Sequence, residues 1–85
     1  MTKEEIIGKL KNIIRPYTEN KEVLESLTEE TDFINDLKIN SANLVDVILD
    51  IEEQFDIVID NEAMEKMLNI KIALEIISKK LAEKE

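Results

Sequence analysis

The sequence predicts an all-α bundle built from three main helices and one short helix. Three observations favour helices over a β-sheet. Apolar residues recur at steps of three and four, the 85 residues include a single glycine, and aromatic residues make up only 4% of the chain. β folds of this size depend on turn glycines and on aromatic strand residues. A chain of this length is expected to form one domain, residues 1–85, around one core.

The first helix is expected to begin in the segment from Thr2 to Glu5, which has the form of a capping box. It should end near Arg15, because Pro16 disfavours α conformation in the residue before it. We interpret residues 16–40 as a long loop with room for a short helical turn near Leu24. Apolar side chains are available to pin this loop to the core: Leu27, Phe33, Ile34, Leu37 and Ile39.

The central helix is expected to be capped by Asn40 or Ser41, since both residue types suit that position, and to end at Phe55 or Asp56. Its periodic apolar residues define a face that joins the core: Leu44, Val47, Ile48, Ile51 and Phe55.

The remaining residues of this helix divide into two surfaces. At about 100° per residue, Asp46, Asp50 and Glu53 lie opposite the core face and form an acidic stripe in water. Val45 and Leu49 project from the flank between this stripe and the serine. Exposed aliphatic side chains beside a serine indicate a contact surface.

After the central helix, residues 57–59 are expected to form a buried connector, because this extended run has no second strand to pair with. Asp60 or Asn61 can cap the short helix. Asn69 can cap the last helix, whose apolar periodicity continues to Leu81.

The composition excludes several classes of function. The net charge of −9, from 20 acidic and 11 basic residues, disfavours nucleic acid and anionic membranes and favours a partner with a basic face. Apolar runs are too short for a membrane span or a secretory signal, so we expect a cytoplasmic protein. Histidine and cysteine are absent, which removes the usual general base, thiolate nucleophile and zinc ligands. We therefore do not expect an enzyme or a metal site.

Ser41 remains as the candidate functional residue. Considered alone, it is a helix cap. A hydroxyl at the start of a helix is also well placed to receive a phosphate ester, because the helix end offers unpaired N–H groups and partial positive charge. In that case another protein would supply the catalysis.

From Phe33 to Ile77 the sequence resembles the acyl carrier proteins of fatty-acid and polyketide synthesis. That family carries the motif Asp-Ser-Leu followed by a helix of the form x-x-Val-Glu-Leu-x-x-x-Leu-Glu-Glu-x-Phe. This chain reads Asn40-Ser41-Ala42 and ends the corresponding helix with Glu52-Glu53-Gln54-Phe55. The preceding Asp36-Leu37 and the later Asp60-Asn61-Glu62 also match. Asparagine and alanine replace the usual aspartate and leucine, which bears on the choice of transferase and partner.

The resemblance implies an acyl-carrier-like four-helix bundle with a long loop between its first two helices, and a monomer. It implies that Ser41 carries 4′-phosphopantetheine, transferred from coenzyme A by a phosphopantetheinyl transferase. The thiol of this arm would hold acyl intermediates as thioesters and move them between enzymes of fatty-acid or polyketide type synthesis.

Two further sets of residues take roles from the resemblance. Residues that would meet the basic docking faces of acyl-loading and synthase enzymes are Asn40, Val45, Asp46, Leu49, Glu52 and Glu53. Residues that would line an acyl pocket between the central and short helices are Val47, Ile51, Ile59, Met64, Met67 and Leu74. Each pocket residue considered singly is ordinary core, although methionine repacks at low cost.

Two alternatives remain open at this point. One is a peptidyl or aryl carrier protein, which commonly has a Gly-Gly pair before the serine where this chain has Lys38-Ile39-Asn40. The other is an unmodified acidic helical adapter in which Ser41 only caps a helix. The unusual Asn40 and Ala42 suggest a specialised carrier of a secondary pathway.

Overall fold

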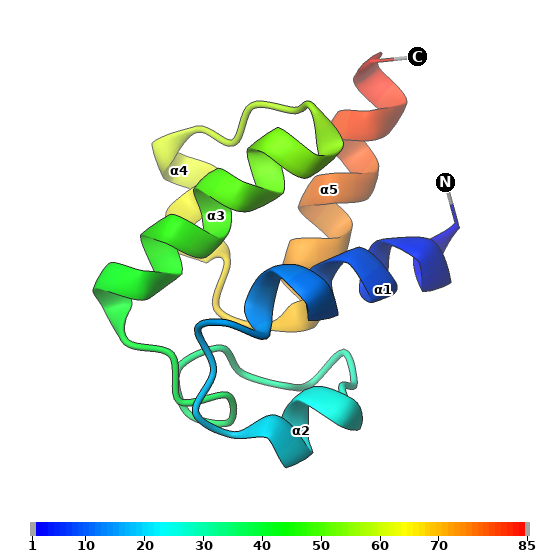
Figure 1. The fold of residues 1–85 in the computed structure, drawn as a ribbon. Coiled ribbons are helices and arrows are strands. Elements are labelled where there is room, and N and C mark those ends of the chain that lie inside the picture. The colour runs from blue at the N-terminus through cyan, green and yellow to red at the C-terminus, as the bar shows by residue number, and fades with distance from the viewer. Residues whose placement is uncertain (1, 85) are drawn as a thin grey trace.

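The computed structural model describes residues 2–84, which form five helices and no strand (Figure 1). The helices are α1 (Lys3–Ile14), α2 (Lys21–Glu25), α3 (Ser41–Phe55), α4 (Asn61–Lys66) and α5 (Ile70–Lys84). Helix α1 packs against α2, α3 and α5, and α4 lies behind α3 in the view of Figure 1. The predicted all-α bundle of three main helices and one short helix is confirmed. Helix α2 forms inside the long loop, where the sequence left room for a turn.

Side-chain caps set where the helices begin. Thr2 Oγ1 accepts a hydrogen bond from the Glu5 N–H at 3.2 Å, and Asp60 Oδ1 accepts one from the Ala63 N–H at 2.8 Å. Asn69 Oδ1 accepts the Ile72 N–H at 3.0 Å. Each bond satisfies an N–H that has no partner inside its helix. These capping residues therefore fix where α1, α4 and α5 begin.

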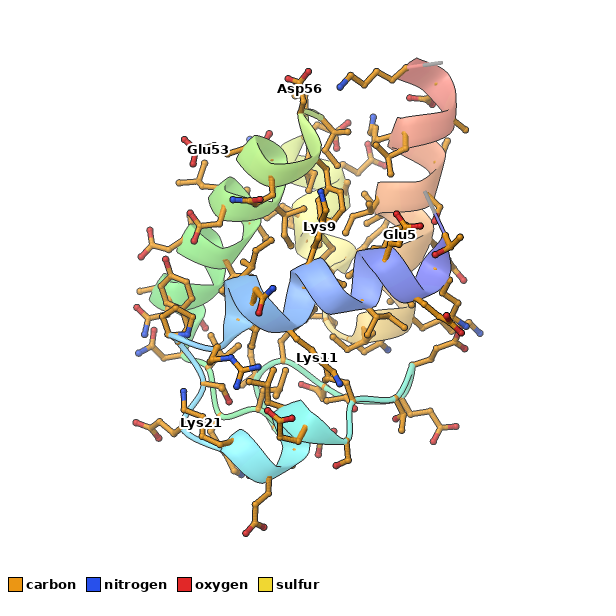
Figure 2. All side chains as sticks on the ribbon, turned by 45° about the vertical axis from the view of Figure 1, so that its right-hand side comes forward. Glu5, Lys9, Lys11, Lys21, Glu53 and Asp56 are labelled. Atoms are coloured by element: carbon orange, nitrogen blue, oxygen red, sulfur yellow. The ribbon has the colours of Figure 1, made fainter. Side chains whose placement is uncertain are left out.

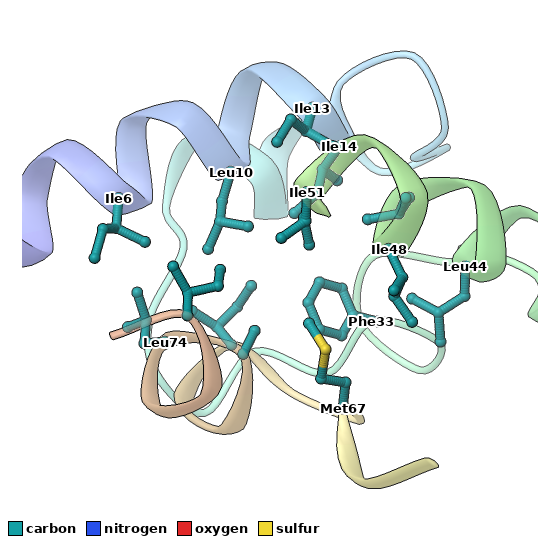
Figure 3. Packing of buried hydrophobic residues seen from close by; sticks show 14 of the residues in the cluster. Ile6, Leu10, Ile13, Ile14, Phe33, Leu44, Ile48, Ile51, Met67 and Leu74 are labelled. Atoms are coloured by element: carbon teal, nitrogen blue, oxygen red, sulfur yellow. The ribbon is translucent and has the colours of Figure 1, made fainter. Parts of the chain in front are cut away.

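The core is one cluster of aliphatic side chains around Phe33 (Figure 3). Its largest fully buried members come from every helix except α4 and from the segments between helices: Phe33, Ile6, Leu10, Ile14, Leu24, Leu37, Ile39, Ile48, Ile51, Met67, Ile70 and Ile77. Met67, which follows α4, inserts its thioether beside Phe33 (Figure 3). Burial of this apolar surface is the main source of stability in a chain without disulfides.

The long loop is held by buried side chains and by backbone pairing. Phe33, Leu37 and Ile39 are buried as expected. The expectation that Ile34 pins the loop is wrong, because its side chain is 38% exposed. Asp32 Oδ1 accepts a hydrogen bond from the Ile34 N–H at 2.9 Å. The resulting turn buries Phe33 and leaves Ile34 at the surface. The Phe33 N–H also donates to the Leu68 carbonyl at 3.1 Å.

The connector between α3 and α4 is only partly buried. Ile57 and Ile59 face the core, whereas Val58 is 74% exposed. Alternate residues of an extended segment point to opposite sides, so a fully buried connector was not attainable. No helix among residues 2–84 has the length and apolar character needed to cross a bilayer.

Candidate functional site

Ser41 is the first residue of α3 and is exposed. The cap is the preceding residue: Asn40 has extended backbone angles, and its Oδ1 accepts the Asn43 N–H at 2.8 Å. The Asn40 carbonyl also accepts the Leu44 N–H at 2.9 Å. The Ser41 hydroxyl makes no hydrogen bond to any residue from 2 to 84. Of the two capping residues that the sequence allowed, Asn40 has this role, and the serine side chain is not used in folding.

The segment before Ser41 is anchored by buried side chains and by hydrogen bonds to its backbone. Leu37 and Ile39 are buried, the Leu37 carbonyl accepts a hydrogen bond from the Thr18 hydroxyl, and the Ile39 N–H donates to the Phe33 carbonyl at 3.1 Å. These contacts hold the chain firmly up to the residue before the cap. Ser41 therefore emerges at the surface from a well-packed support.

We call six residues the docking face: Asn40, Val45, Asp46, Leu49, Glu52 and Glu53. The aliphatic pair is exposed, Val45 by 44% and Leu49 by 51%. Asp46 and Glu53 are also exposed, and Glu53 projects from the outer side of α3 (Figure 2). Glu52 is half-buried, because its Oε2 accepts the Ile59 N–H at 2.8 Å. This carboxylate holds the α3–α4 connector against α3.

Asp50 is also engaged within the protein. It belongs to the predicted acidic stripe but is half-buried, and its Oδ2 accepts a hydrogen bond from the Tyr17 hydroxyl at 3.0 Å. This hydrogen bond, with partial burial and the charges of Asp50 and Asp46, raises the pKa of Tyr17. The bond ties the turn after α1 to the outer side of α3.

Several known proteins are similar to this chain over nearly its whole length. No protein-family model matches the chain. The acyl carrier protein of Coprothermobacter proteolyticus is 33% identical over 99% of this chain and 100% of its own length. That of Lactobacillus acidophilus is 38% identical over 91% of this chain and 94% of its own. The chain belongs to the acyl carrier protein family.

Solved structures of acyl carrier proteins have the same fold. The crystal structure of the Thermotoga maritima protein superposes with a TM-score of 0.82 and 26% identity, over 98% of this chain and 94% of that one. The Enterococcus faecalis acyl carrier protein gives 0.76 and 25%, over 94% and 99%. As a member of this family the protein is a carrier and not an enzyme.

The residues expected around an acyl pocket are packed in this acyl carrier protein. Val47, Ile51 and Met67 are fully buried, Ile59 is buried, and Met64 is half-buried. Four surface hollows of about 230 to 300 Å³ are lined by none of these five residues.

Leu74, the sixth expected pocket residue, lies apart from the rest. Figure 3 shows it across from Ile6 of α1, whereas Met67 lies at the other end of the cluster. It borders a surface hollow together with Lys3 and Glu29. Leu74 is therefore placed at the α1–α5 contact and not between α3 and α4.

Sequence reasoning missed two features beside the site. One is the Tyr17–Asp50 hydrogen bond, for which a lone tyrosine after Pro16 was the only signal. The other is Lys38, which has a positive φ of 58°. The sequence shows a lysine shortly before the predicted attachment serine, but it does not show the backbone conformation of that lysine.

Proposed function

We propose that Ser41 carries a 4′-phosphopantetheine arm and that the arm holds acyl intermediates as thioesters. This proposal rests on one observation at the start of α3, which is that the cap and the exposed serine are different residues. Asn40 caps the helix, so the exposed Ser41 hydroxyl has no structural use within residues 2–84. By contrast, Ser26 Oγ donates to the Glu22 carbonyl at 3.0 Å. An uncommitted hydroxyl on a rigid support is suited to accept the arm from coenzyme A.

The surroundings of Ser41 fit the phosphate of such an arm. The backbone N–H groups of Ser41 and Ala42 have no hydrogen-bond partner among residues 2–84, as expected in the first turn of a helix. They and the helix dipole place partial positive charge where the phosphate would be attached. When bound, the arm supplies the thiol that this cysteine-free chain lacks.

The docking face supports exchange between enzymes. Exposed Asp46 and Glu53 would steer basic faces of a phosphopantetheinyl transferase and of acyl-loading and synthase enzymes, which raises association rates. Val45 and Leu49 offer a small apolar contact, so affinity stays modest and release is fast. Glu52 contributes mainly by holding the connector. These features suit a monomeric carrier in the cytoplasm that meets several enzymes in turn.

A paired substitution tests the docking face separately from folding. Replacing Val45 and Leu49 by alanine should slow transferase modification, while the free energy of unfolding changes by no more than about 0.5 kcal/mol per site. Replacing exposed Glu65 by glutamine, outside the docking face, is the control. Equal modification rates in all three proteins would remove the aliphatic pair from the interface.

We also propose that a long acyl chain is sheltered between α3 and α4. Met64 is half-buried at the edge of the core, and Met67 lies fully inside it. Their unbranched side chains can repack at low cost, and Ile59 is buried in the connector between α3 and α4. Comparing NMR amide shifts of Ile59 and Met64 between the thiol form and a long-chain acyl form tests this. Unchanged shifts would exclude shelter at this place.

Intact mass tests the attachment itself. Incubation with coenzyme A and a promiscuous phosphopantetheinyl transferase should add the mass of one phosphopantetheine to the wild type and nothing to Ser41→Ala. Ser78→Ala, a change at an exposed serine of α5, should be modified like the wild type. An unaltered wild-type mass would favour the acidic adapter without a prosthetic group.

We assign the carried groups to fatty-acid or polyketide type synthesis and not to peptidyl or aryl transfer. The acyl carrier proteins among the relatives support this choice. Loading assays with acyl and aminoacyl donors would distinguish the classes, and preferential aminoacyl loading would contradict the assignment.

A further inference from the structure

Lys38 is an isolated cation close to Ser41. Every other charged residue between positions 22 and 65 is acidic. Lys38 is exposed and forms no ion pair or hydrogen bond with its side chain among residues 2–84. Asp36, the carboxylate nearest in the sequence, accepts the Asp32 N–H at 2.8 Å. In the unmodified protein this positive side chain, whose charged neighbours in the sequence are acidic, has no ion-pair partner among residues 2–84.

The backbone of Lys38 is also unusual. Its φ of 58° lies in the left-handed region, which glycine and asparagine adopt more readily than lysine. The only other non-glycine residue of the described chain with positive φ is Asp56, at the end of α3. Leu37 and Ile39 on either side of Lys38 are buried, so the chain is anchored on both sides of this residue. Lysine at this position therefore costs stability relative to glycine, which adopts positive φ freely.

The distance along the chain allows Lys38 to reach a group on Ser41. Three residues span at most about 11 Å between Cα atoms, and the lysine ammonium sits on a flexible four-carbon stem. The full span exceeds the Debye length of about 8 Å at physiological salt, so exposed charges that far apart would be largely screened. Pairing therefore requires the flexible lysine stem to bring the ammonium close to a phosphate on Ser41.

We propose that Lys38 is the counter-ion of the phosphodiester on Ser41. Its ammonium would pair with a phosphate oxygen of the arm and so neutralise part of the negative charge that modification adds beside α3. This inference rests on the proposed function, because the pair exists only after Ser41 is modified. It also gives a role to the only basic residue between positions 22 and 65.

The test compares the effect of modification in three proteins. Lys38→Asn removes the charge with a residue that tolerates the left-handed conformation, and Lys38→Arg keeps the charge. The backbone cost is shared by the unmodified and modified forms of each protein, so it cancels in the difference between their melting temperatures. At low salt, modification should raise the melting temperature of the wild type and Lys38→Arg by roughly 1–5 °C more than that of Lys38→Asn. High salt should remove the difference.

A second readout reports the pair directly. The ³¹P resonance of the phosphodiester should shift between wild type and Lys38→Asn, and the side-chain signals of Lys38 should move on modification. Lys79→Gln, a change at an exposed lysine of α5, should leave the ³¹P resonance at its wild-type position, and its Lys38 signals should still move on modification. Intact mass first establishes that each protein is modified. A wild type that gains no mass refutes the proposed function. Modified proteins with equal melting differences and an unmoved ³¹P resonance refute the role of Lys38 alone.

Discussion

Replacing Asn40 by alanine should destabilise the unmodified protein, whereas replacing Ser41 should not. The Asn40 side chain accepts the Asn43 N–H at 2.8 Å, and its loss leaves that donor without a protein partner. Removing such a cap costs about 1 kcal/mol. The exposed Ser41 hydroxyl makes no bond within residues 2–84, so Ser41→Ala should stay within about 0.5 kcal/mol of the wild type.

Thermal unfolding followed by far-UV circular dichroism measures both changes. A loss of 1 kcal/mol lowers the melting temperature of a domain of this size by roughly 4–8 °C. Asn40→Asp is the matched control, because aspartate caps as well as asparagine and its charge favours the start of a helix. If Ser41→Ala lowered the melting temperature as much as Asn40→Ala, the serine would be a structural cap and the argument for its availability would fail.

Three further predictions concern the pH dependence and the core. The only tyrosine, Tyr17, should form tyrosinate at a pH above its usual pKa of 10.0, and Asp50→Asn should lower that pKa. Since the folded-state pKa of Tyr17 is raised, the stabilisation is complete below pH 10 and lost as pH rises through the folded value. Absorbance titrations of tyrosinate that coincide for the wild type and Asp50→Asn would contradict this prediction. The Lys84 ammonium, 2.7 Å from the Asp56 carboxylate, lowers the pKa of Asp56 from 3.8. That stabilisation is present above pH 3.8 and lost as pH falls through the folded value. A ¹³C titration of Lys84→Gln should show a higher pKa for Asp56, and an unchanged pKa would rule out the pair. Met67→Ala should lower the free energy of unfolding by about 2–5 kcal/mol in urea titrations, and a loss below about 1 kcal/mol would mean that the core closes over the gap.

The main helices could be predicted because their signals are local. Apolar spacing and a polar cap occur within one helix, so Thr2 and Asn69 marked their helix starts correctly. The exposure of Ile34 and Val58 could not be predicted in the same way. Their exposure depends on a turn organised by Asp32 and on an extended connector whose alternate residues face the core.

The candidate site was predictable to a similar degree. Helical geometry alone placed Val45 and Leu49 on an exposed flank near Ser41, and the structure agrees. It could not show that Glu52 bonds to the backbone of Ile59, because that contact requires the return path of the connector. The attachment to Ser41, the acyl pocket, the single domain and the specialised pathway stay predictions.

A thiol count tests the central claim most directly. The chain contains no cysteine, so the purified protein should react with no thiol reagent. After treatment with coenzyme A and a phosphopantetheinyl transferase, and removal of small molecules, the wild type should show about one thiol per chain and Ser41→Ala none. Absence of a thiol in the treated wild type, or an equal count in Ser41→Ala, would contradict the account.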